Sequence, residues 1–437
     1  MQKLSSMPIV CVAIFIMACG MSYGEDITPT LVPTGFVSLR EGQVVKGEKE
    51  FGFTQARADH VWIQEMVVGL NVLAEFNNLP LTGNLGMEIK ICNDNIVYSG
   101  DFGQSRRLNF YPYLSRADLI YTMGDKENPG LAIDAGYFPF KYNSEVRNLG
   151  EYLFRSGTYP QYLITNFDFP MTRLMGLHVS GSLWRSVIWD VLATTNIEWT
   201  AIGDLNLSGL LSWKPSPLFE LGLGASWCSI LSVNWDNTTP ITEGNVYVSD
   251  SMRYYYTFAG QKAMARFTLD LQQLFPGNDL FGKQDLKLYS EAAILGLVNY
   301  PVSFDGYTRY DTLWQRIPVM VGFNVPTFKV MDFLSVEAEW FGNPYPNNLN
   351  TIMFDNQPTP LSSYGNEKDP ANLNNHGDDW KWSVYGRKTF ADHFNVTFQC
   401  ARDHLRWFRL DYTKQDGKEA LRKNNEWYYT FKLGYTF

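Results

Sequence analysis

Apolar side chains recur at every second position along most of the chain. In the segment 316–325, one face of the expected strand carries Ile317, Val319, Val321, Phe323 and Val325. The same alternation runs through 205–213, 219–227 and 334–340. Because successive side chains of a strand point to opposite faces, a period of two predicts strands with one apolar face. Helical spacing is nowhere sustained, so the chain is predicted to be all-β.

Runs of this kind predict about sixteen strands, and bacterial β-barrels have an even number of strands. The expected spans are 33–40, 61–76, 84–98, 113–122, 130–139, 172–183, 187–197, 203–213, 218–233, 254–271, 285–299, 314–325, 331–342, 380–389, 393–408 and 426–437. The predicted fold is a transmembrane antiparallel β-barrel.

The lengths of the connections support a barrel over other all-β folds. Long connections at 99–112, 140–171, 234–253, 300–313, 343–379 and 409–425 alternate with short ones such as WRS, KPSP and FADH. Two connections break the rhythm, 198–202 being brief and 272–284 long. Barrels have tight turns at one rim and extended loops at the other, whereas propellers and sandwiches have no reason to sort loops by parity. The long loops are therefore expected outside the cell, and the short turns and both termini in the periplasm.

The first 24 residues are expected to be a cleaved signal peptide, which leaves 25–437 as the barrel. Lys3 precedes the apolar run MPIVCVAIFIMA, and small residues lead up to the acidic pair Glu25 and Asp26. A lipoprotein signal ending at Cys19 is the alternative, which Met17 fits poorly.

Composition narrows the classes further. After Gly24 no run reaches the ~20 apolar residues of a spanning helix. Mean hydropathy is -0.20 and 15% of residues are aromatic, as suits strands that are half polar and rich in interfacial rings. A net charge of -9 argues against nucleic acid as a partner. The residues form no zinc motif, no phosphate loop and no nucleophile–base set, so no metal, cofactor or enzyme activity is expected.

One face of the predicted strands carries charges of both signs. These inward positions are Glu65, Glu75, Glu88, Lys90, Asp134, Asp190, Arg266, Asp270, Arg316, Glu337, Glu339, Lys381, Arg387 and Lys432. A barrel of about sixteen strands is too wide for side chains to fill, so this face is expected to line a water-filled lumen. The alternative is a plugged barrel whose charges pair across the wall. Because both signs occur, ion preference stays open.

The third long connection, 140–171, is unusually apolar for an exposed loop. It contains Leu149, Leu153, Phe154 and several further aromatic residues. We expect it to fold inward against the lumen wall and to form a pore constriction with Glu145, Arg147, Glu151, Tyr152 and Arg155. A compact Ω-loop that caps the outer rim is the alternative.

The last strand, WYYTFKLGYTF, has apolar residues on one face and ends on Phe437. With the signal peptide, the alternating connections and the long third loop, it resembles the sixteen-stranded bacterial porins. The resemblance implies an outer-membrane barrel in lipid, an inward third loop and a homotrimer. It also implies a signal read by the barrel-assembly machinery, carried here by Lys432, Gly434, Tyr435 and Phe437.

The function expected from this pattern is passive diffusion of small hydrophilic solutes, with sugars as candidates because aromatic rings can stack on pyranose faces. A surface-binding or adhesion barrel that acts through loops such as 343–379 is the alternative. A secreted carbohydrate-active protein is a third, and it would be released without detergent.

Overall fold

The computed structural model describes residues 29–47, 59–76, 79–93, 108–124, 129–154, 172–184, 186–195, 203–231, 246–249, 252–255, 260–277, 279–297, 312–342, 379–405, 421 and 423–437. The predicted signal peptide and nearly all of 343–379 lie outside these ranges. Within them, no helix combines the length and apolarity needed to cross a membrane.

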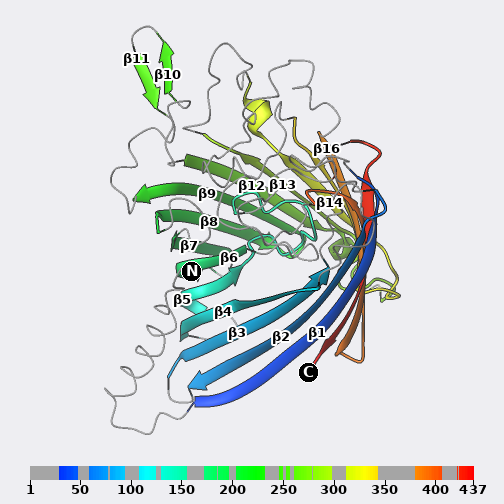
Figure 1. The fold of residues 1–437 in the computed structure, drawn as a ribbon. Coiled ribbons are helices and arrows are strands. Elements are labelled where there is room, and N and C mark those ends of the chain that lie inside the picture. The colour runs from blue at the N-terminus through cyan, green and yellow to red at the C-terminus, as the bar shows by residue number, and fades with distance from the viewer. Residues whose placement is uncertain are drawn as a thin grey trace.

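Sixteen of the strands formed by these residues close into one antiparallel barrel (Figure 1). They are β1 (Pro29–Lys46), β2 (Trp62–Phe76), β3 (Leu81–Asn93), β4 (Leu108–Gly124), β5 (Pro129–Phe140), β6 (Thr172–Leu183), β7 (Val187–Thr195), β8 (Leu205–Ser216), β9 (Phe219–Leu231), β12 (Gly260–Asp270), β13 (Lys287–Ile294), β14 (Val319–Val325), β15 (Phe333–Trp340), β16 (Trp380–Phe390), β17 (Phe394–Arg402) and β18 (Trp427–Thr436). The predicted fold class is confirmed.

Strand boundaries differ from the predicted ones beside long connections. The expected strand 254–271 begins at Gly260, and the preceding connection holds a separate hairpin of β10 (Val246–Ser249) and β11 (Met252–Tyr255). The expected strand 314–325 begins at Val319. Before it, Leu313–Arg316 form a 3₁₀ turn that Thr312 and Gln315 cap reciprocally, so the alternation of 314–318 is not that of a strand.

The barrel closes where the first and last strands pair. Residues 36–44 of β1 align with 436–428 of β18, and the backbones of Gly35 and Phe437 exchange hydrogen bonds of 2.8 and 2.9 Å. The blue first strand and the red last strand meet at this seam in Figure 1. The terminal aromatic residue thus completes the ladder of backbone hydrogen bonds.

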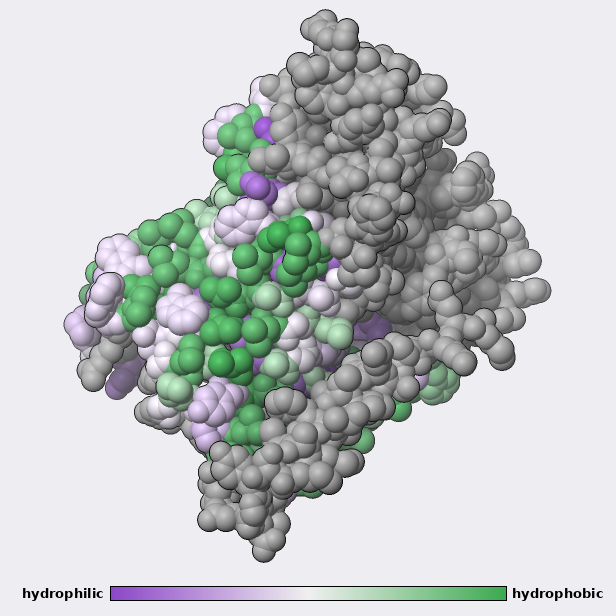
Figure 2. Space-filling view, turned by 90° about the vertical axis from the view of Figure 1, so that its left-hand side faces the viewer, coloured by the Kyte–Doolittle hydropathy of each residue, from purple (hydrophilic) through white to green (hydrophobic). Residues whose placement is uncertain are grey.

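The two faces of the wall differ as the alternation predicts. On β18, Phe431, Leu433 and Tyr435 are 56, 44 and 50% exposed, whereas Tyr428 and Thr430 are 1 and 5% exposed. Large apolar residues are exposed on other strands as well, and Figure 2 shows them gathered across one outer side of the barrel. A continuous apolar exterior of this kind suits lipid rather than water.

Beyond Phe437, β1 has an open edge. Residues 29–34 pair with β2 alone, and the Gly35 N–H points toward β18. Because neighbouring residues direct their N–H groups to alternate sides, positions 29 and 33 would point theirs to the open edge. Both are proline, which has no N–H, so Leu31 is the one residue of 29–34 that would direct an N–H to this edge.

The seam is expected to tolerate no added atom at Gly42. A Cβ there would collide with the carbonyl oxygen of Tyr429, whereas one at Gly209 meets nothing within 4 Å. Gly42→Ala should destabilise the barrel by about 1–3 kcal/mol, as overpacking does, and Gly209→Ala should not. The temperature of the heat-induced mobility shift in detergent gels measures this. Equal shifts in both variants would contradict the role of the seam.

Candidate functional site

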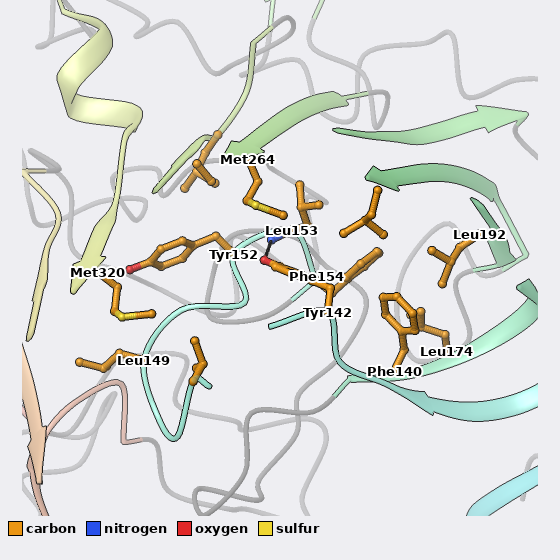
Figure 3. Close-up of a cluster of buried hydrophobic side chains, with 14 of the residues drawn as sticks. Phe140, Tyr142, Leu149, Tyr152, Leu153, Phe154, Leu174, Leu192, Met264 and Met320 are labelled. Atoms are coloured by element: carbon orange, nitrogen blue, oxygen red, sulfur yellow. Dashed lines mark hydrogen bonds between the residues drawn. The ribbon is translucent and has the colours of Figure 1, made fainter. Parts of the chain in front are cut away.

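The segment that follows β5 lies inside the barrel. In 141–154, every residue except Lys141 and Ser144 is buried. Figure 3 shows its side chains among those of several wall strands. The segment therefore occupies part of the cross-section that the wall would otherwise leave open.

One carboxylate on the wall holds the tip of this segment. Glu337 of β15 accepts the backbone N–H groups of Arg147, Asn148 and Leu149 at 2.6, 2.8 and 2.8 Å. It also accepts the hydroxyl of Tyr289 at 2.8 Å. Hydrogen bonds to an ionised acceptor are the strong ones, and here four donors offset the burial of the charge.

Glu337 stands on the wall opposite the strand from which the segment starts. Around the closed sheet, β15 is the eighth strand from β5 in either direction. A chain that leaves β5 and binds β15 must therefore extend across the lumen. Asn148 reaches the end of a further strand on that side, where its Nδ2 donates at 2.6 Å to Asp403, the residue after β17.

A second carboxylate binds the base of the segment. Glu291 of β13 accepts the Tyr142 hydroxyl at 2.5 Å, the Asn143 Nδ2 at 3.1 Å and the Tyr152 N–H at 2.8 Å. From β12, the Lys262 ammonium donates to the Tyr152 and Leu153 carbonyls at 3.2 and 3.0 Å. Donors and acceptors of the segment are thus matched on both sides.

The inner wall is not polar throughout. Between β5 and β12, an apolar row receives the aromatic residues of the segment (Figure 3), and it comprises Phe138, Phe140, Leu174, Leu192, Leu210 and Met264. Leu153 and Phe154 lie on this side, whereas Leu149 and Tyr152 extend toward Met320 of β14 (Figure 3), and all four are at most 1% exposed. Burying one such side chain contributes about 1.5–3 kcal/mol. The apolar residues of the loop and those of the inner wall are thus buried against each other.

A tight turn shapes the segment. Gly150 and Glu151 have φ values of 97° and 61°, and a Cβ on Gly150 would lie 2.8 Å from the methyl carbon of Met320. The Glu151 carboxylate accepts the Asn143 N–H at 2.6 Å, which closes the segment on itself. Burial and the neighbouring Glu291 raise the pKa of Glu151 to about 8.

Comparison with known proteins agrees with this geometry. No protein-family model and no curated protein matches the sequence. The solved structure of OprB from Pseudomonas putida superposes with a TM-score of 0.51 at 9% identity, over 93% of this chain and 94% of that one. The fold is that of a porin-type β-barrel. The resemblance expected from the sequence is confirmed at this level.

Two further solved structures resemble the porin-type barrel. Salmonella typhi OmpF, in a complex with daunomycin, has a TM-score of 0.47 and 12% identity over 94% of this chain and 98% of that one. A triple mutant of the Rh. blastica porin has a TM-score of 0.45 and 10% identity over 93% and 100%. At these values the two add no argument of their own.

The predicted constriction residues lie in the segment but bind the wall. Glu145 accepts from the Lys287 ammonium at 3.0 Å, and the Arg147 guanidinium lies 4.4 Å from the Phe333 ring centre. Tyr152 donates its hydroxyl to Glu339 at 2.7 Å. Glu151 lies in the turn described above, and Arg155 is outside the described residues.

The predicted wall residues fall into separate groups. Glu337 and Glu339 bind the segment directly. Three others make contacts within the wall or with its loops. Lys90 pairs with Glu65, Arg266 pairs with Glu220 at 2.7 Å, and Lys381 donates to the Leu421 carbonyl at 2.9 Å. Lys90 and Arg266 lie on strands other than those of the segment-binding carboxylates, whereas Lys381 aligns with Glu339 on the neighbouring strand.

Three further predicted wall residues have other surroundings. Glu88 accepts from the Tyr113 hydroxyl and from Arg173. Asp134 shares the inner face of β5 with Phe138. Arg316 lies in the 3₁₀ turn and donates to the Gly296 carbonyl at 2.6 Å, so the prediction that it sits on a wall strand is wrong.

Several residues that bind the segment were absent from the predicted set, among them Glu291 and Lys262. Glu291 and Lys262 lie within the predicted spans 285–299 and 254–271, at inward positions by the alternation. The alternation therefore placed both side chains on the inner face, but it did not indicate which inward residues contact the segment. Glu291 lies six strands from β5 and Lys262 lies five strands from it, so their contact with the segment can be predicted only once the closed sheet is known.

Replacing Glu337 by alanine should release the tip of the segment. About 1.5 kcal/mol of lost anchoring corresponds to roughly tenfold faster opening. We expect that increase in amide hydrogen exchange at 147–149. Glu220→Ala is the matched control, because Glu220 is a wall carboxylate that binds Arg266 instead. Unchanged exchange in Glu337→Ala would contradict the anchor.

The buried Glu151 predicts a stability that falls as pH rises. Its pKa is about 8 in the folded protein against an ordinary value of 4.5, so the folded state retains the proton to higher pH. Its contribution is full below pH 4.5, declines by about 1.4 kcal/mol per pH unit above that, and is lost as pH passes 8.

Glu151→Gln keeps the shape of the side chain and removes its titratable carboxyl group. Its unfolding temperature should fall less than that of the wild type between pH 5 and about 8. Parallel curves for the two proteins would mean that Glu151 titrates normally.

Proposed function

We propose that the protein is a channel through which small hydrophilic solutes diffuse across a bacterial outer membrane. The observation that carries this is the combination of a closed sixteen-strand barrel and a segment held across its lumen. Side chains cannot fill so wide a barrel, and its exposed exterior is apolar. Water inside and lipid outside is the arrangement that suits both faces.

The segment 141–154 is proposed as the constriction. Glu337 and Glu291 fix its position, and the apolar row between β5 and β12 fixes its depth. A loop that is anchored at several points narrows the passage to a fixed width, so solutes are sorted by size. Arg155 and the rest of 140–171 belong to this proposal as the continuation of the same loop.

The proposal includes export and assembly. Residues 1–24 would direct the chain out of the cytoplasm and be removed. The exposed apolar wall would contact outer-membrane lipid. Lys432, Gly434, Tyr435 and Phe437 would form the signal for the barrel-assembly machinery, and a homotrimer would follow from the porin-type fold. No catalytic step is part of this function.

A preference for sugars has less support among the described aromatic residues. The rings of Tyr142, Tyr152, Phe154 and Tyr289 are buried to 9% exposure or less. Buried rings offer no face on which a pyranose could stack. The proposed solute class is therefore small and hydrophilic, without a stated sugar preference.

Purified protein in a planar lipid bilayer should give discrete ion conductance. Removing 145–155 should raise the conductance and admit larger neutral solutes in a size series, because the segment would no longer narrow the lumen. Deletion of 343–379 is the control for loss of a long loop outside the described residues.

Absence of conductance in correctly folded protein would overturn the channel. Loss of surface attachment on deletion of 343–379, without conductance in any variant, would favour the adhesion barrel instead.

A further inference from the structure

The connection between β17 and β18 is buried at both of its ends. In the part of it that the structure describes, residues 403–405 follow β17, and residues 421 and 423–426 precede β18. Asp403, Leu405, Leu421 and Glu426 are each at most 3% exposed. A loop that runs outward from the wall would be solvated at these points. Both ends of the β17–β18 connection are instead covered by protein.

Contacts with wall side chains place these ends against the inner face of the barrel. Glu339 is two residues from Glu337 on β15 and so shares its inner face, and Lys381 of β16 aligns with Glu339. At one end of the connection, His404 Nε2 is hydrogen-bonded to Glu339 at 2.7 Å. At the other end, the Leu421 carbonyl accepts from the Lys381 ammonium at 2.9 Å. The two ends therefore meet neighbouring strands on the lumen side.

The same connection contacts the inward segment. Asp403 Oδ2 accepts the Asn148 Nδ2 of the segment at 2.6 Å. The Glu339 carboxylate, which binds His404 through one oxygen, accepts the Tyr152 hydroxyl through the other at 2.7 Å. Successive residues of the connection thus hold two points of the segment, the first directly and the second through a wall carboxylate.

The wall behind these contacts is closed to solvent. The inward side chains of Glu337, Glu339, Lys381 and Tyr428, on β15, β16 and β18, are each at most 3% exposed. Ser383, which shares the inner face of β16 with Lys381, is 0% exposed. A hydrophilic solute needs a water-filled path, so it cannot pass between the segment and this sector of the wall. The passage is therefore bounded on this side by two connections.

We infer that the β17–β18 connection is a second element of the constriction, and that Asp403 is the positioning residue that holds the segment against it. Asp403 is 2% exposed. In addition to Asn148, its carboxylate accepts the Tyr428 hydroxyl at 2.7 Å and the Leu405 N–H at 3.0 Å. Removing a buried, charged acceptor leaves its donors without that partner, which favours separation of the segment from the wall. The inference rests on the proposed channel function and adds a residue that sets the width of the passage without touching the solute.

The first test measures whether solvent reaches this sector of the wall. S383C and S144C are treated with a charged, membrane-impermeant thiol reagent, and labelling is read as a mass increase, in a background with serine at Cys92, Cys228 and Cys400. Ser144 is the exposed residue of the segment and provides the positive control. S383C should react at least ~10-fold more slowly than S144C, because its thiol is reached only through local opening. Adding D403A should raise the rate of S383C several-fold.

The second test measures single-channel conductance in a planar lipid bilayer. D403A should raise the conductance, and should raise several-fold the permeation of neutral solutes near the size limit, because the sector then admits water. N148A should act in the same direction, and N148A/D403A should add little to D403A, since the two residues act through one contact.

Asp285→Ala is the matched control for D403A. Asp285 is 0% exposed and its carboxylate also accepts three donors. Those donors belong to Gly282, Thr327 and Phe328, in the turns before β13 and β15 at the opposite rim of the barrel. The control therefore removes a comparable buried acceptor without touching the segment, and its conductance should equal that of the wild type.

The outcomes separate the two proposals, because labelling is read without conductance. A folded wild type that does not conduct would overturn the channel itself. Labelling of S383C at the rate of S144C would overturn the second element of the constriction and leave the channel intact, and this result does not depend on the folding of D403A. Unchanged conductance in folded D403A, or an equal rise in D403A and Asp285→Ala, would overturn the positioning role of Asp403.

Discussion

Every backbone hydrogen bond of a lipid-exposed sheet must be made within the protein, because the hydrocarbon region offers no alternative partner. This constraint determines the architecture. The first and last strands have to meet, and they do so with the terminal Phe437 bonded to Gly35. Where β1 continues past that seam, prolines stand at 29 and 33, two of the three positions whose N–H groups would face the open edge. Closure thus accounts for the pairing of the first and last strands.

A closed wall of sixteen strands encloses a wide interior, and the inward segment fills part of it. The segment could not lie inside by apolar contact alone, since its backbone donors would be left without partners. Glu337 and Glu291 supply the acceptors, and Lys262 supplies a donor for two carbonyls. The aromatic residues of the segment pack against apolar side chains of the wall. One part of the inner wall therefore binds the segment by apolar packing, and another part binds it through charged acceptors.

Alternation along the strands was enough to predict all sixteen barrel strands, because an apolar outer face alternates with an inner face that is polar on most strands. It failed at 246–255 and 314–318, where local hairpin and capping interactions replace the sheet. The apolar residues of 140–171 indicated that this loop needs a surface to pack on. Which wall residues meet the segment could not be read from the sequence, since Glu337 becomes its neighbour only when β15 is placed opposite β5.

Ion preference was open because inward charges of both signs are similar in number, and counting them treats each charge as equal. The structure distinguishes them by accessibility. A carboxylate that accepts several hydrogen bonds at 1% exposure projects little field into the lumen, as its donors carry compensating partial charges. Several inward cations are equally buried and held by wall contacts, such as Arg266 with Glu220. Glu337 and Glu291 hold the segment, so a count of inward charges does not give the ion preference of the lumen.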